Sequence, residues 1–424
     1  MTVTELKNTI NNGEFDEKFQ LLYSKENIPA ARERYLNAVF EFEKIFGSEG
    51  SVSVFSVPGR SEISGNHTDH NHGKVIAASV DLDIIAIARR TDGNTVRVKS
   101  AGFDMDTVDI NVRDGYERFT SCALIAGVID GLEKRGFEIC GFDAYTTSNV
   151  FKGSGLSSSA AFENMIGTIL NHFSNDGKID FVTISQISQY AENVFFGKPS
   201  GLMDQIACAA GGFVGIDFED PTEPVVKTID FDLTKEGYSL AIVNTGGNHA
   251  NLNDEYAAIT VEMKKICKFF GKSYLRELTK EDVLNNVTAL RASCGDRAIL
   301  RALHFFNENQ RVEKQLKALE NKDLGTFFEN VTASGRSSLQ MLQNIFCCAS
   351  PEDQGLTLAL SLCPEILDER CVWRVHGGGF AGTILVFVPQ DTVNKFKTDI
   401  EKFFGDGSCF ILKVRTVGAV CLSK

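Results

Sequence analysis

Helix-like and strand-like patterns of apolar residues are mixed along this chain, without the regular alternation of strand and helix that a parallel sheet requires. Apolar residues at three- and four-residue spacing predict helices in a leading segment over 1–48, clearest at 32–46, and again at 119–135, 157–173, 183–196, 254–270, 298–320 and 324–346. Short β-branched runs predict strands at 52–56, 74–80, 84–88, 95–99, 240–243, 372–375, 383–388 and 409–414. The pattern changes around 211–217, and no segment repeats. We therefore predict an α+β fold in two parts.

A glycine- and serine-rich run, GSGLSSSAA at 153–161, leads directly into one of these helices. In that helix Phe162, Ile166, Ile169 and Phe173 recur on one face. Glycines let the backbone approach a ligand, and the first turn of a helix presents unpaired N–H groups at the positive end of its dipole. The run therefore suits a phosphate. Taken alone, a capped helix start after a flexible loop is the more common reason for such a run.

A second run, PGRSEISGNHTDH at 58–70, crowds a cation, imidazoles, an amide and carboxylates between glycines. No apolar period explains these residues. A ligand rich in hydroxyl groups needs such a mixture, because each hydroxyl both donates and accepts a hydrogen bond. A polar surface loop is the alternative for this segment taken alone.

A third run, RVHGGGFAG at 374–382, formally contains the glycine pattern of dinucleotide-binding folds. That fingerprint requires a helix after the glycines, whereas TILVFV at 383–388 predicts a strand. We therefore reject the dinucleotide-binding interpretation. A glycine turn between strands, which lets the backbone approach a substrate or phosphates, fits better.

In this order and at these separations, the three runs resemble the GHMP kinase superfamily and, within it, the galactokinases. Galactokinases carry patterns close to G-R-x-N-x-I-G-E-H-T-D-Y, P-x-G-x-G-L-S-S-S-A and G-G-G-F-G-G, and GLMDQ at 201–205 is similar to their G-I-M-D-Q segment. The resemblance extends from roughly Phe55 to Gly418. It implies a two-domain GHMP kinase fold with the active site in the cleft between the domains. We expect these domains at 1–215 and 216–424.

The resemblance also implies an activity, the ATP-dependent phosphorylation of galactose at its anomeric hydroxyl, and a role for each matching residue. Asp204 matches the catalytic base, and Arg60 matches the partner that keeps it ionised. The matching sugar contacts are Asn66, His67, Asp69, Gly201 and Tyr256. The matching ATP-binding loop is Gly153, Ser154, Gly155, Leu156, Ser157, Ser158, Ser159 and Ala160. Ser158 and Glu192 match positions that hold Mg²⁺, and the sequence leaves open which serine of 157–159 coordinates the ion.

The match breaks where Asn66 replaces the family's glutamate, His70 its tyrosine and Ala381 a glycine. In galactokinases that glutamate lies near C6 of the sugar. An asparagine there would remove a negative charge and could accept a carboxylate at C6. Galactose is thus the expected substrate, with galacturonate or N-acetylgalactosamine as the alternative. A third possibility is a galactokinase-like sugar sensor without activity, although such proteins are damaged in the serine run that is intact here.

Composition narrows the class of protein further. The 424 residues are 43% apolar and 23% charged, which is ordinary for a globular chain, and the net charge of −13 argues against nucleic-acid binding. Neither a signal pattern nor an apolar run of membrane-spanning length is present, and eleven cysteines without a CxxC pair suggest no disulfide framework or zinc site. We expect a cytoplasmic, monomeric enzyme whose partners are a small sugar and ATP.

Overall fold

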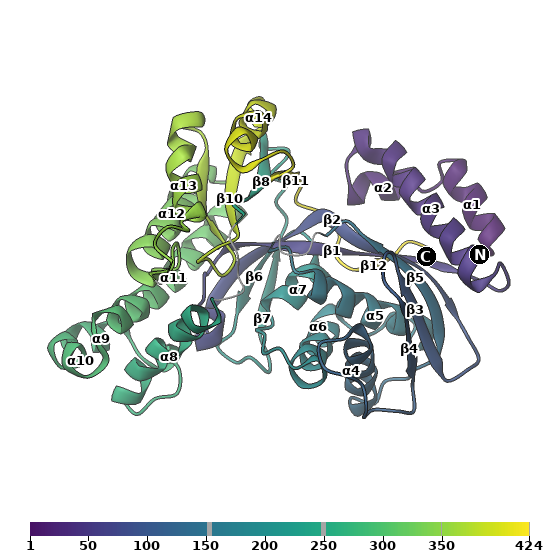
Figure 1. Ribbon diagram of the computed structural model, residues 1–424, viewed down its shortest axis with the longest axis horizontal. Helices are drawn as coiled ribbons and strands as arrows, with labels where there is room; N and C mark the ends of the chain where they lie inside the picture. The colour runs from purple at the N-terminus through teal and green to yellow at the C-terminus, as the bar shows by residue number, and fades with distance from the viewer. Residues whose placement is uncertain (151–154, 247–251, 349, 424) are drawn as a thin grey trace.

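The computed structural model describes residues 1–150, 155–246, 252–348 and 350–423, and it places them in two sheets flanked by helices (Figure 1). The larger sheet has eight strands in the order β12-β1-β2-β5-β3-β4, with β6 and β7 added beside β2. The smaller sheet has four strands in the order β11-β8-β10-β9. Because helices and largely antiparallel strands are mixed in this way, the α+β prediction is confirmed.

The larger sheet is built around one long strand. Its strands are β1 (Ser53–Ser64), β2 (Lys74–Arg90), β3 (Thr95–Ser100), β4 (Met105–Asp109), β5 (Phe142–Ser148), β6 (Phe213–Asp217), β7 (Val225–Ile229) and β12 (Val420–Cys421). The two runs predicted at 74–80 and 84–88 form the single strand β2. Its first part pairs with β6 and its last part pairs with β5. Pairing with different neighbours at its two ends is what makes β2 the centre of the sheet.

Helices cover both faces of this sheet (Figure 1). The covering helices are α1 (Val3–Asn11), α2 (Asp16–Leu22) and α3 (Ile28–Phe46) on one face, and α4 (Ser121–Lys134), α5 (Ser158–Ser174), α6 (Phe181–Tyr190) and α7 (Met203–Ala210) on the other. Strand residues alternate between the two cores: Val54 and Ile87 pack with α1–α3, whereas Phe55 and Ala86 pack with α4–α6. The period of two along each strand therefore buries every second residue on each side.

The second half of the chain is mainly helical. It contains α8 (Asn253–Phe269), α9 (Lys280–Asn285), α10 (Val287–Cys294), α11 (Asp296–Glu320), α12 (Leu324–Ser337), α13 (Gly355–Ile366) and α14 (Val393–Phe404). Its sheet consists of β8 (Tyr238–Asn244), β9 (Val372–His376), β10 (Thr383–Pro389) and β11 (Cys409–Leu412). On one face Phe387 packs against Phe327 and Phe328 of α12, and on the other Val386 packs in the core formed with α13 and α14. The smaller sheet is thus also covered on both faces.

Five short helical turns complete the described elements, and none of them was predicted as a separate unit. They are η1 (Lys25–Asn27), η2 (Asp69–Asn71) and η4 (Leu275–Glu277), together with two π-helical turns, η3 (Ala191–Phe196) and η5 (Ser338–Leu342), that extend α6 and α12. The helix predicted at 324–346 is therefore too long. It ends where Gln343 adopts a left-handed conformation with φ of 58°.

The division between the two halves is not a single point in the sequence. The predicted boundary between 215 and 216 lies within β6, and β7 still belongs to the larger sheet. After β11 the chain returns to that sheet, where β12 pairs Val420 with Ser56 and Cys421 with Phe55. The two chain ends consequently lie near each other beside α1 (Figure 1). In the described part of the chain, no helix combines the length and apolar character that crossing a membrane requires.

Candidate active site

Four segments that are distant in the sequence meet at the junction of the two halves. They are the end of β1, the start of α5, the start of α7, and the glycine turn between β9 and β10. Each of the three motif runs contributes one of them. Gly155 lies so close to the third run that a Cβ added there would be 3.1 Å from Nδ1 of His376. The sheet and the helix ends therefore bring the predicted motifs into one site.

Asp204 is held by two donors at the start of α7. Arg60 donates from Nε and Nη2 to one carboxylate oxygen, at 2.9 and 2.7 Å, and Ser157 Oγ donates to the other. The Arg60 side chain is 8% exposed, whereas that of Asp204 is 30% exposed. Burial alone would raise the pKa of Asp204, but the Arg60 charge and the Ser157 hydrogen bond outweigh it and lower the pKa below its ordinary value. The carboxylate is thus kept ionised and partly open.

Arg60 in turn is fixed to the start of the predicted phosphate loop. Its Nη1 donates to the carbonyl of Gly155, and its backbone N–H donates to the carbonyl of Leu156 at 3.1 Å. Leu156 and Ala160 are buried, while Ser157 adopts a left-handed conformation with φ of 58° at the N-cap of α5. The predicted positions Gly153 and Ser154 lie outside the described residues. The described part of the loop therefore connects the Arg60–Asp204 ion pair to the N-terminus of a helix, where anions bind favourably.

Glu192 lies beside the same helix start, in the π-helical turn after α6. It is 2% exposed, and Oε1 accepts hydrogen bonds from Ser159 Oγ at 3.2 Å and Lys198 Nζ at 2.9 Å. Gln205 donates to its Oε2 at 2.9 Å and also to Oε2 of Glu163 at 3.1 Å. Oε1 of Glu163 is buried without a partner among the described residues, and burial together with the Glu192 charge raises the pKa of Glu163 well above its ordinary value.

These oxygens form a donor set that fits a hard cation such as Mg²⁺, which prefers carboxylate and hydroxyl ligands. Ser159, and not Ser158, is the serine whose hydroxyl reaches Glu192. The sequence could not distinguish these two because adjacent positions in a helical turn point in different directions.

Asp69 and Gly201 pack directly against each other. Asp69 begins the short turn η2, and a Cβ added to Gly201 would lie 2.2 Å from its Oδ2. Only glycine at 201 leaves room for that carboxylate. The segment that carries Asp204 is therefore packed directly against a predicted sugar contact.

His67 and Tyr256 both contact the glycine turn of the third run. His67 Nε2 donates to the carbonyl of Gly378 at 2.8 Å, and Tyr256 Oη donates to the carbonyl of Gly379 at 2.7 Å. Burial lowers the pKa of His67 to about 4, so its ring is neutral near pH 7. The Nε2 contact is what an ordinary buried, hydrogen-bonded histidine would make. A contact between His67 and the sugar stays a prediction.

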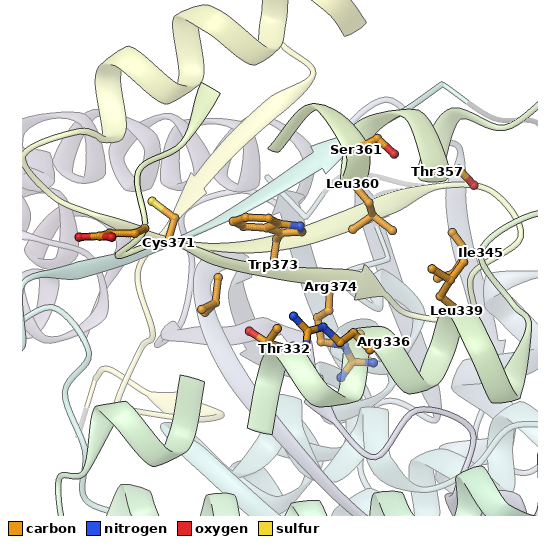
Figure 2. A pocket seen from close by; sticks show the side chains of 13 residues that line it. Thr332, Arg336, Leu339, Ile345, Thr357, Leu360, Ser361, Cys371, Trp373 and Arg374 are labelled. Atoms are coloured by element: carbon orange, nitrogen blue, oxygen red, sulfur yellow. The ribbon is translucent and has the colours of Figure 1, made fainter. Parts of the chain in front are cut away.

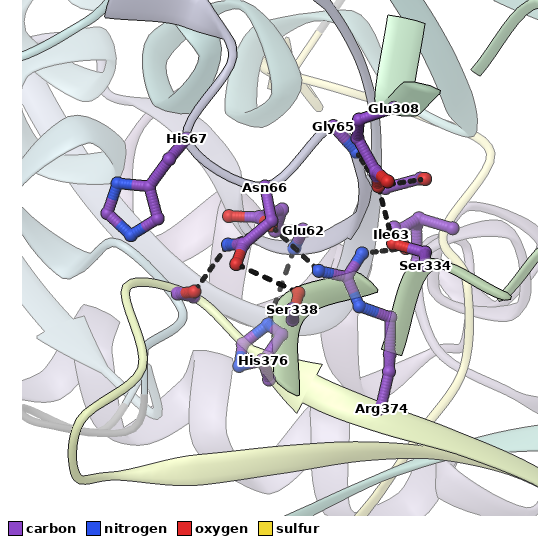
Figure 3. Close-up of polar contacts among 12 residues, drawn as sticks. Glu62, Ile63, Gly65, Asn66, His67, Glu308, Ser334, Ser338, Arg374 and His376 are labelled. Carbon is purple, nitrogen blue, oxygen red and sulfur yellow. Dashed lines mark hydrogen bonds and ion pairs between the residues drawn. The ribbon is translucent and has the colours of Figure 1, made fainter. Parts of the chain in front are cut away.

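Asn66 is enclosed by protein groups (Figure 3). The residue is 1% exposed, and its Nδ2 donates to Oε1 of Glu62 at 2.8 Å and to the carbonyl of Gly377 at 2.7 Å. Its Oδ1 accepts from Nδ2 of Asn344 at 2.7 Å. Glu62 is also reached by Nη2 of Arg374 at 3.4 Å, and the Arg374 side chain is wholly buried. Asn66 therefore links the first run to the third run through its amide.

His376 provides a second link between these runs. Its Nε2 accepts a hydrogen bond from the backbone N–H of Glu62 at 3.3 Å and lies 3.2 Å from Ser61 Oγ. Since a backbone N–H can only donate, the ring proton must be on Nδ1, which donates to Thr383 Oγ1 at 2.9 Å. Burial and the charges of Arg60 and Arg374 lower the pKa of His376 well below its ordinary range. His376 is accordingly a neutral, structural imidazole.

Sequence reasoning missed several residues of this site, namely Glu62, Glu163, Lys198, Asn344, Arg374 and His376. For Glu62 a signal was present, because the family pattern has asparagine at that position. Asn344 follows a predicted helix and carries no local signal.

A cavity of about 450 Å³ lies outside this site, between α12, α13 and β9 (Figure 2). Trp373, Leu339, Leu360 and Arg336 line it. Arg374 also borders it, but its guanidinium donates to the Ile63 carbonyl at 2.7 Å and contacts Glu62. Arg374 therefore reaches from the edge of this cavity to Glu62, while Arg60 and Asp204 do not line the cavity.

Comparison with known proteins identifies the family of this chain. Residues 41–90 match the galactokinase galactose-binding signature, and residues 123–212 match the GHMP kinases N terminal domain. The galactokinase of Streptomyces coelicolor is 31% identical over 371 residues, which cover 86% of this chain and 91% of that protein. The chain belongs to the galactokinase family. As a member of it, the protein is a kinase, a phosphotransferase with an alcohol group as acceptor, that uses ATP.

Other galactokinase relatives and structures extend the same result. The galactokinase of Clostridium tetani is 31% identical over 367 residues, covering 85% of this chain and 90% of that protein. Lactococcus lactis galactokinase, solved in complex with galactose, superposes with a TM-score of 0.77 at 24% identity and covers 91% of this chain and 99% of its own. Methanococcus jannaschii mevalonate kinase superposes with a TM-score of 0.61 at 14% identity, over 86% and 99% of the two chains. The fold is therefore that of the GHMP kinases.

Proposed function

We propose that the protein transfers the γ-phosphoryl group of ATP to the anomeric hydroxyl of galactose, giving galactose 1-phosphate and ADP. The observation that carries this proposal is the Asp204 carboxylate, which is held ionised by Arg60 and Ser157 between the phosphate loop and the Asp69–Gly201 contact. The galactokinase relatives, and the galactose bound in the Lactococcus lactis structure, support the choice of sugar.

In the proposed reaction, Asp204 orients the anomeric hydroxyl and accepts its proton as the new O–P bond forms. A positioned base of this kind contributes roughly 10²- to 10⁴-fold to the rate. Arg60 is permanently charged, so it favours the ionised carboxylate before proton transfer and offsets negative charge near the phosphoryl group during it. The first turn of α5 would hold phosphate oxygens through its N–H groups.

We propose Mg²⁺ as the cofactor, held by Glu192 and the Ser159 hydroxyl. When bound, Mg²⁺ neutralises charge on the phosphate oxygens of the nucleotide. Lys198 donates to the same Glu192 oxygen that accepts from Ser159, so Mg²⁺ would take the place of this ammonium group. The unpartnered Oε1 of Glu163 adds a further polar group that can form a hydrogen bond with a water molecule near the ion.

The electrostatics of the first run favour a neutral hexose over galacturonate. Asn66 removes a carboxylate relative to the family pattern, which was the reason to consider galacturonate. Glu62 restores a carboxylate four residues earlier, next to Asn66, so the negative charge of the run is unchanged. Burial raises the pKa of Glu62, and the charges of Arg374 and Arg60 oppose that rise. In its ionised form, Glu62 together with Asp69 would repel a sugar carboxylate.

The proposal is tested by measuring ADP release with Mg-ATP and a panel of galactose, galacturonate, N-acetylgalactosamine, glucose, mannose and mevalonate. We expect galactose to exceed every other acceptor by about tenfold or more in kcat/KM, the effect of one lost charged hydrogen bond. A preference for a uronic or amino sugar would overturn the choice of substrate. ADP release with none of them, despite ATP binding, would indicate a sensor.

We also propose that the enzyme works as a monomer in the cytoplasm. The chain has eleven cysteines and, in its described part, no disulfide bond, which supports a reducing compartment. Light scattering coupled to size-exclusion chromatography tests the assembly state, and a mass near 46.5 kDa is expected.

A further inference from the structure

The first motif run carries an exchange of two residue types. The family pattern has asparagine and then glutamate four positions later, whereas this chain has Glu62 and then Asn66. The exchanged side chains are in direct contact, because Asn66 Nδ2 donates to Glu62 Oε1 at 2.8 Å. The run has therefore kept one carboxylate and one amide but reversed their positions.

The amide of Asn66 is fully used by protein groups. Its two N–H donors are taken by Glu62 and Gly377, and its carbonyl accepts from Asn344 and, at 3.4 Å, from Ser338 Oγ. A side-chain amide offers two donors and two acceptor lone pairs, so all of its hydrogen-bonding capacity is filled. With 1% exposure, Asn66 has no group left to offer to a substrate.

The carboxylate of Glu62 is only half used. Oε1 accepts from Asn66 and lies 3.4 Å from Arg374 Nη2, which fixes the side chain from two directions (Figure 3). Among the described residues no donor reaches Oε2, and this atom is not among the fully buried unpartnered ones. Glu62 thus has one oxygen held in place and one oxygen available.

The position of Glu62 on β1 directs it toward the reacting groups. Arg60, Ser61 and Glu62 follow one another in unbroken register against β2, so Arg60 and Glu62 share a face of the strand. Arg60 on that face holds Asp204. Arg60 and Asp69 are both close enough to Glu62 to influence its charge. The Glu62 carboxyl consequently lies near Arg60, which holds Asp204, and near Asp69.

We propose that Glu62, held in place by Asn66 and Arg374, accepts a hydrogen bond from a sugar hydroxyl other than the one at C1 and so determines acceptor specificity. This inference rests on the proposed function, since it assigns one contact of the same sugar site. Asn66 and Arg374 are positioning residues that act through Glu62. The carboxylate also excludes acceptors with a negative charge at that hydroxyl position.

The test is a cycle that combines Glu62→Gln with the monodeoxygalactoses lacking the hydroxyl at C2, C3, C4 or C6. Glu62→Gln should lower kcat/KM for galactose by about tenfold or more, through the sugar KM and with the ATP KM unchanged. With one monodeoxygalactose the same substitution should have almost no effect, because the interacting hydroxyl is already missing. Relative activity with galacturonate should rise. Glu313→Gln, at an exposed position of α11, is the matched control and should change none of these values.

An equal loss on galactose and on all four deoxy sugars would overturn the proposal, because it would show that Glu62 acts only on the fold. Failure of the proposed function is distinguishable from this outcome. It appears in the wild-type protein as preference for another sugar, and the cycle is then run on deoxy analogues of that sugar.

A second set of variants tests the exchange itself and does not depend on Glu62→Gln being stable. Glu62→Asn and Asn66→Glu alone should each impair galactose phosphorylation at least tenfold, since one leaves no carboxylate in the pair and the other leaves two. The double variant restores the family arrangement and should recover galactose kcat/KM to within a few-fold of the wild type. If the loss in the double variant equals the product of the two single losses, Glu62 and Asn66 have not exchanged roles.

Discussion

Asp204 gains its chemical usefulness from its partners, and its substitution gives the most direct test at the scale of a single residue. Asp204→Asn keeps the shape of the side chain but removes the proton acceptor, so we expect kcat to fall by about 10²- to 10⁴-fold. ATP affinity, measured by calorimetry, should stay close to the wild-type value. Asp391→Asn, at an exposed position, is the control. Near-normal kcat in Asp204→Asn would remove Asp204 from the mechanism.

Gly201 is expected to matter because its lack of a side chain leaves room for the Asp69 carboxylate. In Gly201→Ala the new Cβ would lie 2.2 Å from Asp69 Oδ2, so that carboxylate must move. Loss of one hydrogen bond to a charged group should raise the sugar KM by about tenfold or more, with a much smaller change in the ATP KM. Gly93→Ala is the matched control, because a Cβ at Gly93 meets no atom within 4 Å. An unchanged sugar KM in Gly201→Ala would show that Asp69 does not contact the acceptor.

At the scale of elements, Glu308 shows how α11 holds the end of β1. It is wholly buried and accepts from Ser64 Oγ, from the Gly65 N–H and from Ser334, and it pairs with Arg311. Burial would raise its pKa, but the Arg311 charge and these hydrogen bonds lower it to about 2. A depressed folded-state pKa means that Glu308 stabilises the fold above its ordinary pKa and that this contribution is lost as the pH falls toward 2.

We therefore expect Glu308→Gln to lower the free energy of unfolding by about 3–5 kcal/mol near pH 7, because it leaves the partners of a buried charge uncompensated. Thermal or urea unfolding followed by circular dichroism measures this loss. The difference from the wild type should shrink as the pH falls below the ordinary value of 4.5, where Glu308 binds a proton in the unfolded state, toward about 2, where it binds one in the folded state as well. A difference that is independent of pH would contradict the role of the charge. Glu313→Gln on the same helix should have little effect.

The sequence predicted the elements of the site better than it predicted their contacts. The helices at 119–135, 157–173 and 254–270 agree closely with α4, α5 and α8, because an apolar face of helical period is a local signal. β4, β5, α13 and α14 were not predicted, although they complete the sheets and their covering layers. The short strands and helices among them depend on burial by distant segments, which no local window contains.

The same limit applies within the site. The family match identified Arg60 and Asp204, which the structure joins in one ion pair. It gave Asn66 the role of a sugar contact, whereas the structure surrounds that amide with Glu62, Gly377 and Asn344. The difference arises because a motif specifies residue types along the chain, while a hydrogen-bonding partner such as Asn344 comes from a remote turn.

At the scale of the whole molecule, the C-terminal segment connects three regions through one buried carboxylate. Asp83 of β2 accepts hydrogen bonds from Tyr23 Oη at 2.6 Å and from Arg415 Nη1 at 3.0 Å, and it also pairs with Arg34 of α3. Arg415 and Asp83 are wholly buried. Burial would raise the pKa of Asp83, but the charges of Arg34 and Arg415 lower it below its ordinary value, so this cluster stabilises the fold above that pKa and loses strength in acid.

Arg415→Met tests whether this cluster holds the returning chain end against the N-terminal helices. Methionine has a similar reach but no charge, so Arg34 would be the one remaining cation paired with Asp83 in the described part of the chain. The hydrogen bond that Arg415 Nη1 donates to Ser56 Oγ at 2.7 Å would also be lost. We expect the free energy of unfolding to fall by about 3–5 kcal/mol. The order of sugar preference should not change, because Arg415 forms no hydrogen bond or ion pair with Asp204 or Glu62. Arg370→Met is the matched control: Arg370 is exposed, and its surface pairs with Asp368 and Asp391 should contribute less than about 1 kcal/mol. Equal losses in the two variants would show that burial of the Asp83 pair adds nothing to the stability of the whole.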